Sequence, residues 1–194
     1  RAFSAAFEAA GIDPASRIVV VTDPGSPLHD LARELGYRKV FLANPEVGGR
    51  YSALSAFGLV PAGLAGADVA SLLAEAQAIA PALGADEPTN PALQLGAFLG
   101  VAHARDTEKL VVAPTSTPII GLGAWLEQLI AESTGKDGEG ILPVVVESVD
   151  APGFADARAD AMLLFIGQAV GTHQPISGFA CAVDEPLGAQ FLLW

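Results

Sequence analysis

Short apolar runs alternate along the first part of the chain with a stretch of helical period. Residues 18–22 form an apolar run that ends in the loop-forming residues 23–27. The helical stretch 28–35 follows and stops at Gly36, and residues 39–43 form a second apolar run. Polar and apolar residues do not alternate within these runs, which is typical of strands buried on both faces of a parallel sheet. The pattern therefore predicts a strand–helix–strand unit with parallel strands.

The same alternation returns after a polar segment broken by two prolines, residues 86–91. Helices are predicted before it at 52–64 and 69–80, and after it Asn90 is expected to cap a helix that runs to about His103, with Pro91 at its first position. The remaining pattern predicts strands at 109–113, 141–147, 161–166 and 178–183, and a helix at 119–133. The first residues of the chain are predicted to lie within a helix, and the last residues, 191–194, at the start of another. We expect an α/β fold with mainly parallel sheets and a domain boundary near residue 86.

Composition supports this fold class. Of the 194 residues, 51% are hydrophobic and 16% charged, which excludes a disordered chain. Cys181 is the single cysteine, so there is no internal disulfide and no multi-cysteine metal site, and a reducing cytoplasm is expected. The most apolar stretch, 110–126, is broken by prolines and glycines. It is interpreted as a buried strand followed by a helix, not as a membrane span.

Net charge narrows the choice of partner. The chain carries 22 acidic and 10 basic residues, a net charge of −12, which argues against nucleic acid as a partner. An anionic ligand would depend on local donors and helix N-termini. His29, His103 and His173 lack metal-ligand spacing, and no complete phosphate-binding or dinucleotide-binding glycine loop is present.

Two motifs carry candidate chemistry. Gly48-Gly49-Arg50 follows a predicted strand, where open parallel sheets place their ligands. The glycines allow a close approach to the backbone, and the arginine offers a planar fork of donors. Gln128 and Glu132 are four residues apart and share a helical face. Taken alone, the first motif more often marks a tight turn with a surface arginine, and the second more often an ordinary exposed glutamate.

In combination, these motifs resemble the glucose-6-phosphate isomerases. Residues 23–28, 47–55, 131–138 and 140–144 are similar to the compact bacterial branch, which includes the isomerase half of transaldolase–isomerase fusions. The resemblance implies two three-layer α/β/α sugar-isomerase domains with the active site between them. Residues 1–85 would be the C-terminal part of the first domain and residues 86–194 most of the second. The chain is then expected to be an internal fragment of a longer protein.

The resemblance also implies roles for individual residues. Glu132 would move a proton between C1 and C2 of the sugar phosphate through a cis-enediol, and Arg50 would stabilise the enediolate oxygen. Gln128, with Gly48 and Gly49, would bind the substrate. The implied reaction interconverts glucose 6-phosphate and fructose 6-phosphate in glycolysis and gluconeogenesis, without a metal or an organic cofactor. Neither nucleic acid nor membrane is an expected partner, and a homodimer and a fused transaldolase domain are left open.

Three features of the family pattern are missing from the chain. The serine- and threonine-rich phosphate loop and the C-terminal lysine-bearing helix are absent, and residues 184–191 contain no histidine where the family places its ring-opening histidine. His173 lies too far upstream to match. Two alternatives therefore stay open: a non-catalytic sugar-phosphate-binding domain of the same fold, and a structural or interaction domain with vestigial motifs. We expect the chain alone to be inactive, and Arg50 and Glu132 to reach a common cleft.

Overall fold

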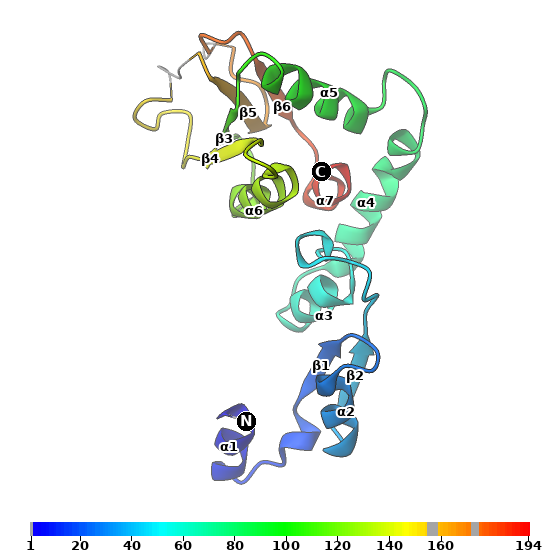
Figure 1. Cartoon of the computed structure of the whole chain (residues 1–194). Helices are drawn as coiled ribbons and strands as arrows, with labels where there is room; N and C mark the ends of the chain where they lie inside the picture. Colours follow the sequence, from blue (N-terminus) through cyan, green and yellow to red (C-terminus); the bar gives the residue numbers. More distant parts are fainter. Residues whose placement is uncertain (1, 155–158, 172–174) are drawn as a thin grey trace. The chain divides into compact units, whose positions relative to one another are not determined.

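The computed structural model describes residues 2–154, 159–171 and 175–194, so His173 lies outside the described residues. The chain divides into two compact units, Arg1–Val69 and Ala70–Trp194 (Figure 1). Each unit combines helices with a parallel sheet, which confirms the α/β class. The assignment of residues 1–85 and 86–194 to two sugar-isomerase domains stays a prediction.

The first unit is built around two strands. β1 and β2 pair in parallel, with Val19 opposite Lys39 and Thr22 opposite Leu42, as the spacing of the apolar runs predicted. The elements in chain order are α1 (Ala2–Ala9), η1 (Pro14–Ser16), β1 (Val19–Thr22), α2 (Pro27–Glu34), β2 (Lys39–Leu42), η2 (Gly49–Tyr51) and α3 (Ala56–Leu64).

The ends of α2 follow from its sequence. The side chain of Ser26 accepts a hydrogen bond from the His29 N–H at 3.2 Å and caps the helix, while Pro27 occupies its first turn. Gly36 has φ of 62°, in the left-handed region, and the Tyr37 N–H bonds back to the Ala32 carbonyl. This geometry ends the helix at the predicted glycine.

The second unit contains a four-stranded parallel sheet in the order β4-β3-β5-β6. Its elements are α4 (Val69–Leu83), α5 (Pro91–His103), β3 (Lys109–Thr115), α6 (Leu122–Thr134), β4 (Leu142–Val145), β5 (Ala161–Gly167), β6 (Ala180–Val183) and α7 (Leu187–Leu193). The apolar stretch 110–126 is confirmed as a buried strand followed by a helix. In the described ranges no helix is long and apolar enough to cross a membrane.

Asn90 joins the end of α4 to the start of α5. Its side-chain oxygen accepts hydrogen bonds from the N–H groups of Ala92 and Leu93, which confirms the predicted cap. Its amide nitrogen donates at 2.9 Å to the carbonyls of Leu83 and Ala85. One buried side chain therefore satisfies backbone groups on both sides of the turn.

The two faces of the larger sheet are covered differently. Even-numbered residues of β3 and β5, such as Leu110 and Leu164, pack with residues of α4, α5, α6 and α7 in the larger apolar cluster. Odd-numbered residues, such as Leu163 and Phe165, pack against Phe154 and the preceding loop. In Figure 1, α6 and α7 lie on the same side of the strands. Helices therefore cover one face, and among the described residues a loop covers the other.

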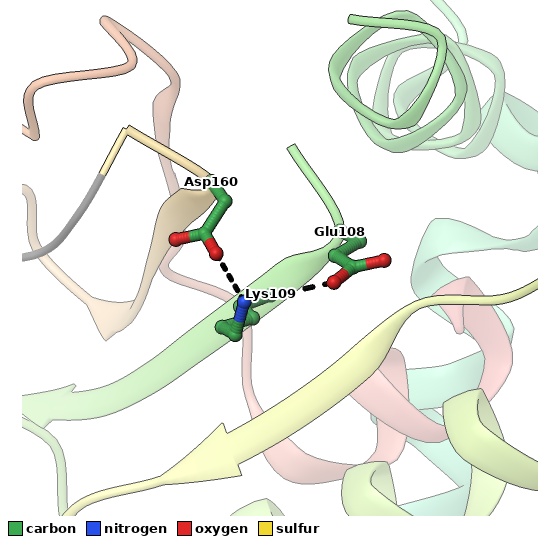
Figure 2. Close-up of polar contacts among 3 residues, drawn as sticks. All are labelled: Glu108, Lys109 and Asp160. Carbon is green, nitrogen blue, oxygen red and sulfur yellow. Dashed lines mark hydrogen bonds and ion pairs between the residues drawn. The ribbon is translucent and has the colours of Figure 1, made fainter. Parts of the chain in front are cut away.

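A charged group lies where β3 and β5 begin (Figure 2). The Lys109 ammonium donates to the Asp160 carboxylate and lies 3.6 Å from a Glu108 carboxylate oxygen. Its backbone N–H also donates to the Asp160 carbonyl. The hydrogen bond to Asp160 is the largest cause that raises the pKa of Lys109 above its ordinary value. The contact supports the register between these two strands at their amino ends.

Candidate functional site

Gly48, Gly49 and Arg50 lie beyond the carboxyl end of β2, as predicted. Gly49 and Arg50 belong to η2, and Gly48 is its N-cap. The Arg50 guanidinium lies over the Tyr51 ring, 4.8 Å from the ring centroid. Arg50 is half-buried, so it is held against its neighbour instead of extending fully into solvent.

The fold itself does not require glycine at positions 48 and 49. Gly48 has φ of −63°, and neither glycine has positive φ. A Cβ atom at Gly49 would meet nothing within 4 Å, and one at Gly48 would lie 3.8 Å from Tyr51 Cδ2. Glycine at these positions therefore leaves space beside the backbone, and the close approach of a ligand there stays a prediction.

The serines around this segment, in contrast, hold the chain in place. The Ser52 hydroxyl donates to the Gly49 carbonyl at 2.7 Å, and the Ser55 hydroxyl donates to the Ser52 carbonyl at 2.7 Å. Ser55 also caps α3 by accepting from the Phe57 N–H. These serines have local structural tasks that explain their presence.

Gln128 and Glu132 share an exposed face near the C-terminal end of α6. The Gln128 amide donates to a Glu132 carboxylate oxygen at 3.4 Å, which confirms that the two side chains lie together. The opposite side of the helix is buried through Leu126, Leu129 and Ile130. Because β4 is parallel to β3, α6 begins at the carboxyl edge of the sheet and returns to its amino edge. The pair therefore belongs to the amino edge.

The segment after Glu132 is shaped by the turn into β4. The Thr134 hydroxyl donates to the Ile130 carbonyl and accepts from the Ile141 N–H. Asp137 and Gly138 both have positive φ, and Lys136 and Glu139 exchange two backbone hydrogen bonds across them. Such a two-residue turn is the one that Asp-Gly favours. The residues that follow Glu132, from Thr134 to Glu139, are therefore largely explained by the turn that reverses the chain into β4.

The candidate polar residues of the two motifs are Arg50, Gln128 and Glu132, to which the family resemblance gives a role. The structure brings Gln128 and Glu132 together, and Lys136 joins them by donating at 2.9 Å to the Glu132 carbonyl. Arg50, with Gly48 and Gly49, belongs to the other unit. A common cleft for Arg50 and Glu132 stays a prediction.

The segment in which the family resemblance expects a histidine has a structural role here. The Gly188 N–H donates to a Glu75 carboxylate oxygen at 2.9 Å. A Cβ atom at Gly188 would lie 1.9 Å from the Leu72 carbonyl oxygen, so only glycine lets α7 approach α4 this closely. No local sequence pattern marks Glu75, because its partner lies 113 residues away.

Cys181 lies in β6, and burial raises the pKa of its thiol to about 12. The thiol is therefore protonated at neutral pH and is a packing residue, not a nucleophile. Among the residues that the structure describes, no three His, Cys, Asp or Glu side chains are grouped as metal ligands.

The relatives of this chain include several glucose-6-phosphate isomerases. The chain is 40% identical over 139 residues to a probable glucose-6-phosphate isomerase of Haloarcula marismortui, a match that covers 71% of this chain and 31% of that protein. It is 38% identical over 133 residues to a glucose-6-phosphate isomerase of Synechococcus sp. (strain JA-3-3Ab), covering 68% and 25%. It is 37% identical over 129 residues to that of Symbiobacterium thermophilum, covering 66% and 29%.

A solved structure has a similar fold. The crystal structure of a hypothetical protein from Thermus thermophilus superposes with a TM-score of 0.66 at 30% sequence identity, over 80% of this chain and 40% of that one. No family model matches the chain.

The fold defines an α/β protein with parallel sheets. Within that class, the resemblance of this chain to the glucose-6-phosphate isomerases is confirmed. The chain spans 25% to 31% of the length of these three relatives.

Proposed function

We propose that this chain supplies catalytic residues to an aldose–ketose isomerase that interconverts glucose 6-phosphate and fructose 6-phosphate. The observation that carries the proposal is the exposed, hydrogen-bonded pair of Gln128 and Glu132, in a chain similar to proteins named for this reaction. The Glu132 carboxylate lies on the exposed face of α6, away from the buried side of the helix.

In the proposed step, the Glu132 carboxylate removes the proton from C2 of the open-chain aldose. The electrons of the broken C–H bond form the C1–C2 double bond of a cis-enediolate, and negative charge develops on O1. Return of the proton from Glu132 to C1, with transfer of the O2 proton to O1, gives the ketose. The reaction balances without an added oxidant, reductant or metal.

Arg50 is proposed to stabilise the developing oxyanion, and Gln128 to bind a sugar hydroxyl. A guanidinium suits the first role because it stays charged and presents several donors in a fixed plane. A preorganised donor of this kind typically contributes about 3 kcal/mol at the transition state. The role requires Arg50 and Glu132 to meet one substrate molecule.

The first test is Glu132→Gln, measured as exchange of the substrate C2 proton in deuterated water. Glutamine keeps the size and much of the hydrogen bonding of glutamate but cannot accept the proton. We expect exchange and kcat to fall by about 10²–10⁴-fold while substrate affinity stays nearly unchanged. Exchange should be measured both for the protein encoded by the complete reading frame that contains these residues and for the 194-residue chain.

Glu127→Gln is the matched control, because Glu127 is an exposed carboxylate on the same helix that does not share the face of Glu132. It should leave exchange at the rate of the unmodified protein. Exchange at that same rate in Glu132→Gln would show that Glu132 is not the base. If the unmodified complete protein binds sugar phosphate without any exchange, the non-catalytic binding domain is the correct interpretation. If the unmodified complete protein binds no sugar phosphate, the structural or interaction domain is the correct interpretation.

A further inference from the structure

A cavity of about 520 Å³ lies at the end of α6 opposite Gln128 and Glu132. It is formed by the end of β3, the loop and first turn of α6, residues 145–147 and Ile166 of β5. The chain leaves β3 towards β4 and then crosses to β5 on the other side of β3. Such a reversal of strand order, at the carboxyl ends of parallel strands, is where open α/β sheets bind small ligands.

The wall of this cavity is mainly aliphatic. Val112, Ile119, Leu122, Val145 and Ile166 contribute branched side chains from five different segments. A volume of this size is in the range of small-molecule sites, and its apolar lining favours a compact hydrocarbon body. Ile120 also lines the cavity and is 96% exposed, so a ligand there would cover apolar surface that now faces water.

The charged and polar residues that line the cavity favour a positively charged ligand. Glu147 is exposed at the cavity and has no ionic or hydrogen-bonding partner among the described residues. The Thr117 hydroxyl accepts a hydrogen bond from the Ile119 N–H within the loop, and the described residues that line the cavity include no lysine or arginine. The net charge of −12 adds a field that attracts cations and repels anions.

We propose that this cavity binds a small aliphatic amine, with the hydrocarbon body against Ile119, Ile120 and Val145 and the ammonium group at the Glu147 carboxylate. The site is separate from the proposed catalytic pair, which lies on the last turns of α6 at the opposite edge of the sheet. It does not depend on the isomerase proposal, because no residue is shared.

Three matched probes test the proposal on the full chain: adamantylamine, adamantanol and adamantanecarboxylate. They share one hydrocarbon cage and differ in charge. Binding is followed by amide chemical shifts in NMR titrations. We expect the shifts to change at residues 119–124 and 145–147, with the amine bound about threefold to fivefold more tightly than the alcohol, as for an exposed ion pair. The carboxylate should bind most weakly, and added salt should reduce the advantage of the amine.

Two variants and a control sharpen the test. Glu147→Gln should reduce the affinity of the amine to that of the alcohol and leave the alcohol unchanged, whereas Glu127→Gln should change neither. Ala124→Leu adds volume at the lining and should weaken all three probes. Shifts confined to residues 128–134, equal affinity for the three probes, or tightest binding of the carboxylate would each overturn the proposal. So would an unchanged preference for the amine in Glu147→Gln.

Discussion

Buried side-chain amides hold two turns of the second unit together. Asn90 bonds to four backbone groups, and Gln190, which is fully buried, donates to the carbonyls of Val183 and Glu185 and accepts from the Trp194 indole N–H. Truncating such a residue leaves several buried backbone groups without partners, and each of these groups then loses the hydrogen bond that offset its desolvation.

Asn90→Ala is therefore expected to lower the free energy of unfolding by about 2 kcal/mol. It removes a helix cap and, at the same time, the two hydrogen bonds that the Asn90 amide donates to backbone carbonyls. Urea unfolding measures the change. The control is Asn44→Ala, because Asn44 is exposed and, among the described residues, its side chain accepts a hydrogen bond only from the Glu46 N–H in a local turn. That change should cost about 0.5 kcal/mol. Equal losses in the two variants would contradict the structural role given to Asn90.

The raised pKa of the Cys181 thiol should make the free energy of unfolding depend on pH. Its pKa rises from 9.0 to about 12 on folding, so above pH 9 the unfolded chain releases a proton that the folded chain keeps. The free energy of unfolding should therefore be unaffected below pH 9 and fall between pH 9 and 12. At about pH 10 the loss should be about 1 kcal/mol.

Urea unfolding at about pH 8 and about pH 10 isolates this effect, because the raised pKa of Lys109 acts only above its ordinary value of 10.5. Cys181→Ala should lose less stability between the two pH values than the unmodified chain. The same loss in both proteins would assign the pH dependence to another group.

At the scale of elements, proline positions show why the predicted bounds were close but not identical. The prediction ended β3 before Pro114, yet the strand runs to Thr115. Lys109 directs its N–H to β5, so the nitrogen of Pro114 faces the β4 side, where β4 has already ended opposite Val112. No ladder bond is lost there. Pro143 is tolerated for a related reason, since its nitrogen faces away from β3 on an edge strand.

Local chemistry was sufficient to predict most elements, because caps and turns act over a few residues. The four-residue spacing of Gln128 and Glu132 was likewise enough to place them on one face. Contacts between distant segments could not be predicted in this way. The bond between Glu75 and Gly188, and the loop that covers the second face of the sheet, leave no periodic signal in the sequence. The relation of Arg50 to Glu132 is of this distant kind.

The packing of α6 on β4 gives a prediction at this scale. A Cβ atom at Gly123 would lie 2.6 Å from Val145 Cγ1, so Gly123→Ala should force the helix from the strand and cost about 1–3 kcal/mol. Val145→Ala removes the obstructing methyl group. In a double-mutant cycle, the two changes together should cost clearly less than the sum of the single changes. Additive costs in urea unfolding would show that α6 and β4 do not contact each other here.

At the scale of the whole molecule, buried residues are distributed unevenly between the units. In the described part of the first unit, they are Val20, Thr22, Ala32 and Ala43. The second unit contains two apolar clusters and a strand, β5, that is buried along its whole length. A two-stranded sheet with so little buried surface has low stability by itself.

Hydrogen exchange on the full chain should follow this distribution. Amides of β5 are expected to exchange most slowly, at rates set by global unfolding of the second unit, whereas amides of β1 and β2 should exchange faster through local opening. Mass spectrometry of peptides from the two regions gives the comparison. Equal protection of β1 and β5 would show that the units unfold together.

The aromatic residues offer a way to observe each unit separately. Both tryptophans, Trp125 and Trp194, lie in the second unit, where Trp125 packs edge-to-face on Phe191 with ring centroids 4.9 Å apart. Both tyrosines, Tyr37 and Tyr51, lie in the first. Fluorescence excited selectively in the indole band therefore reports on the second unit alone. Tyr51 also lies beneath the Arg50 guanidinium, so the ultraviolet absorbance of its phenol would sense a ligand at Arg50 without any added label.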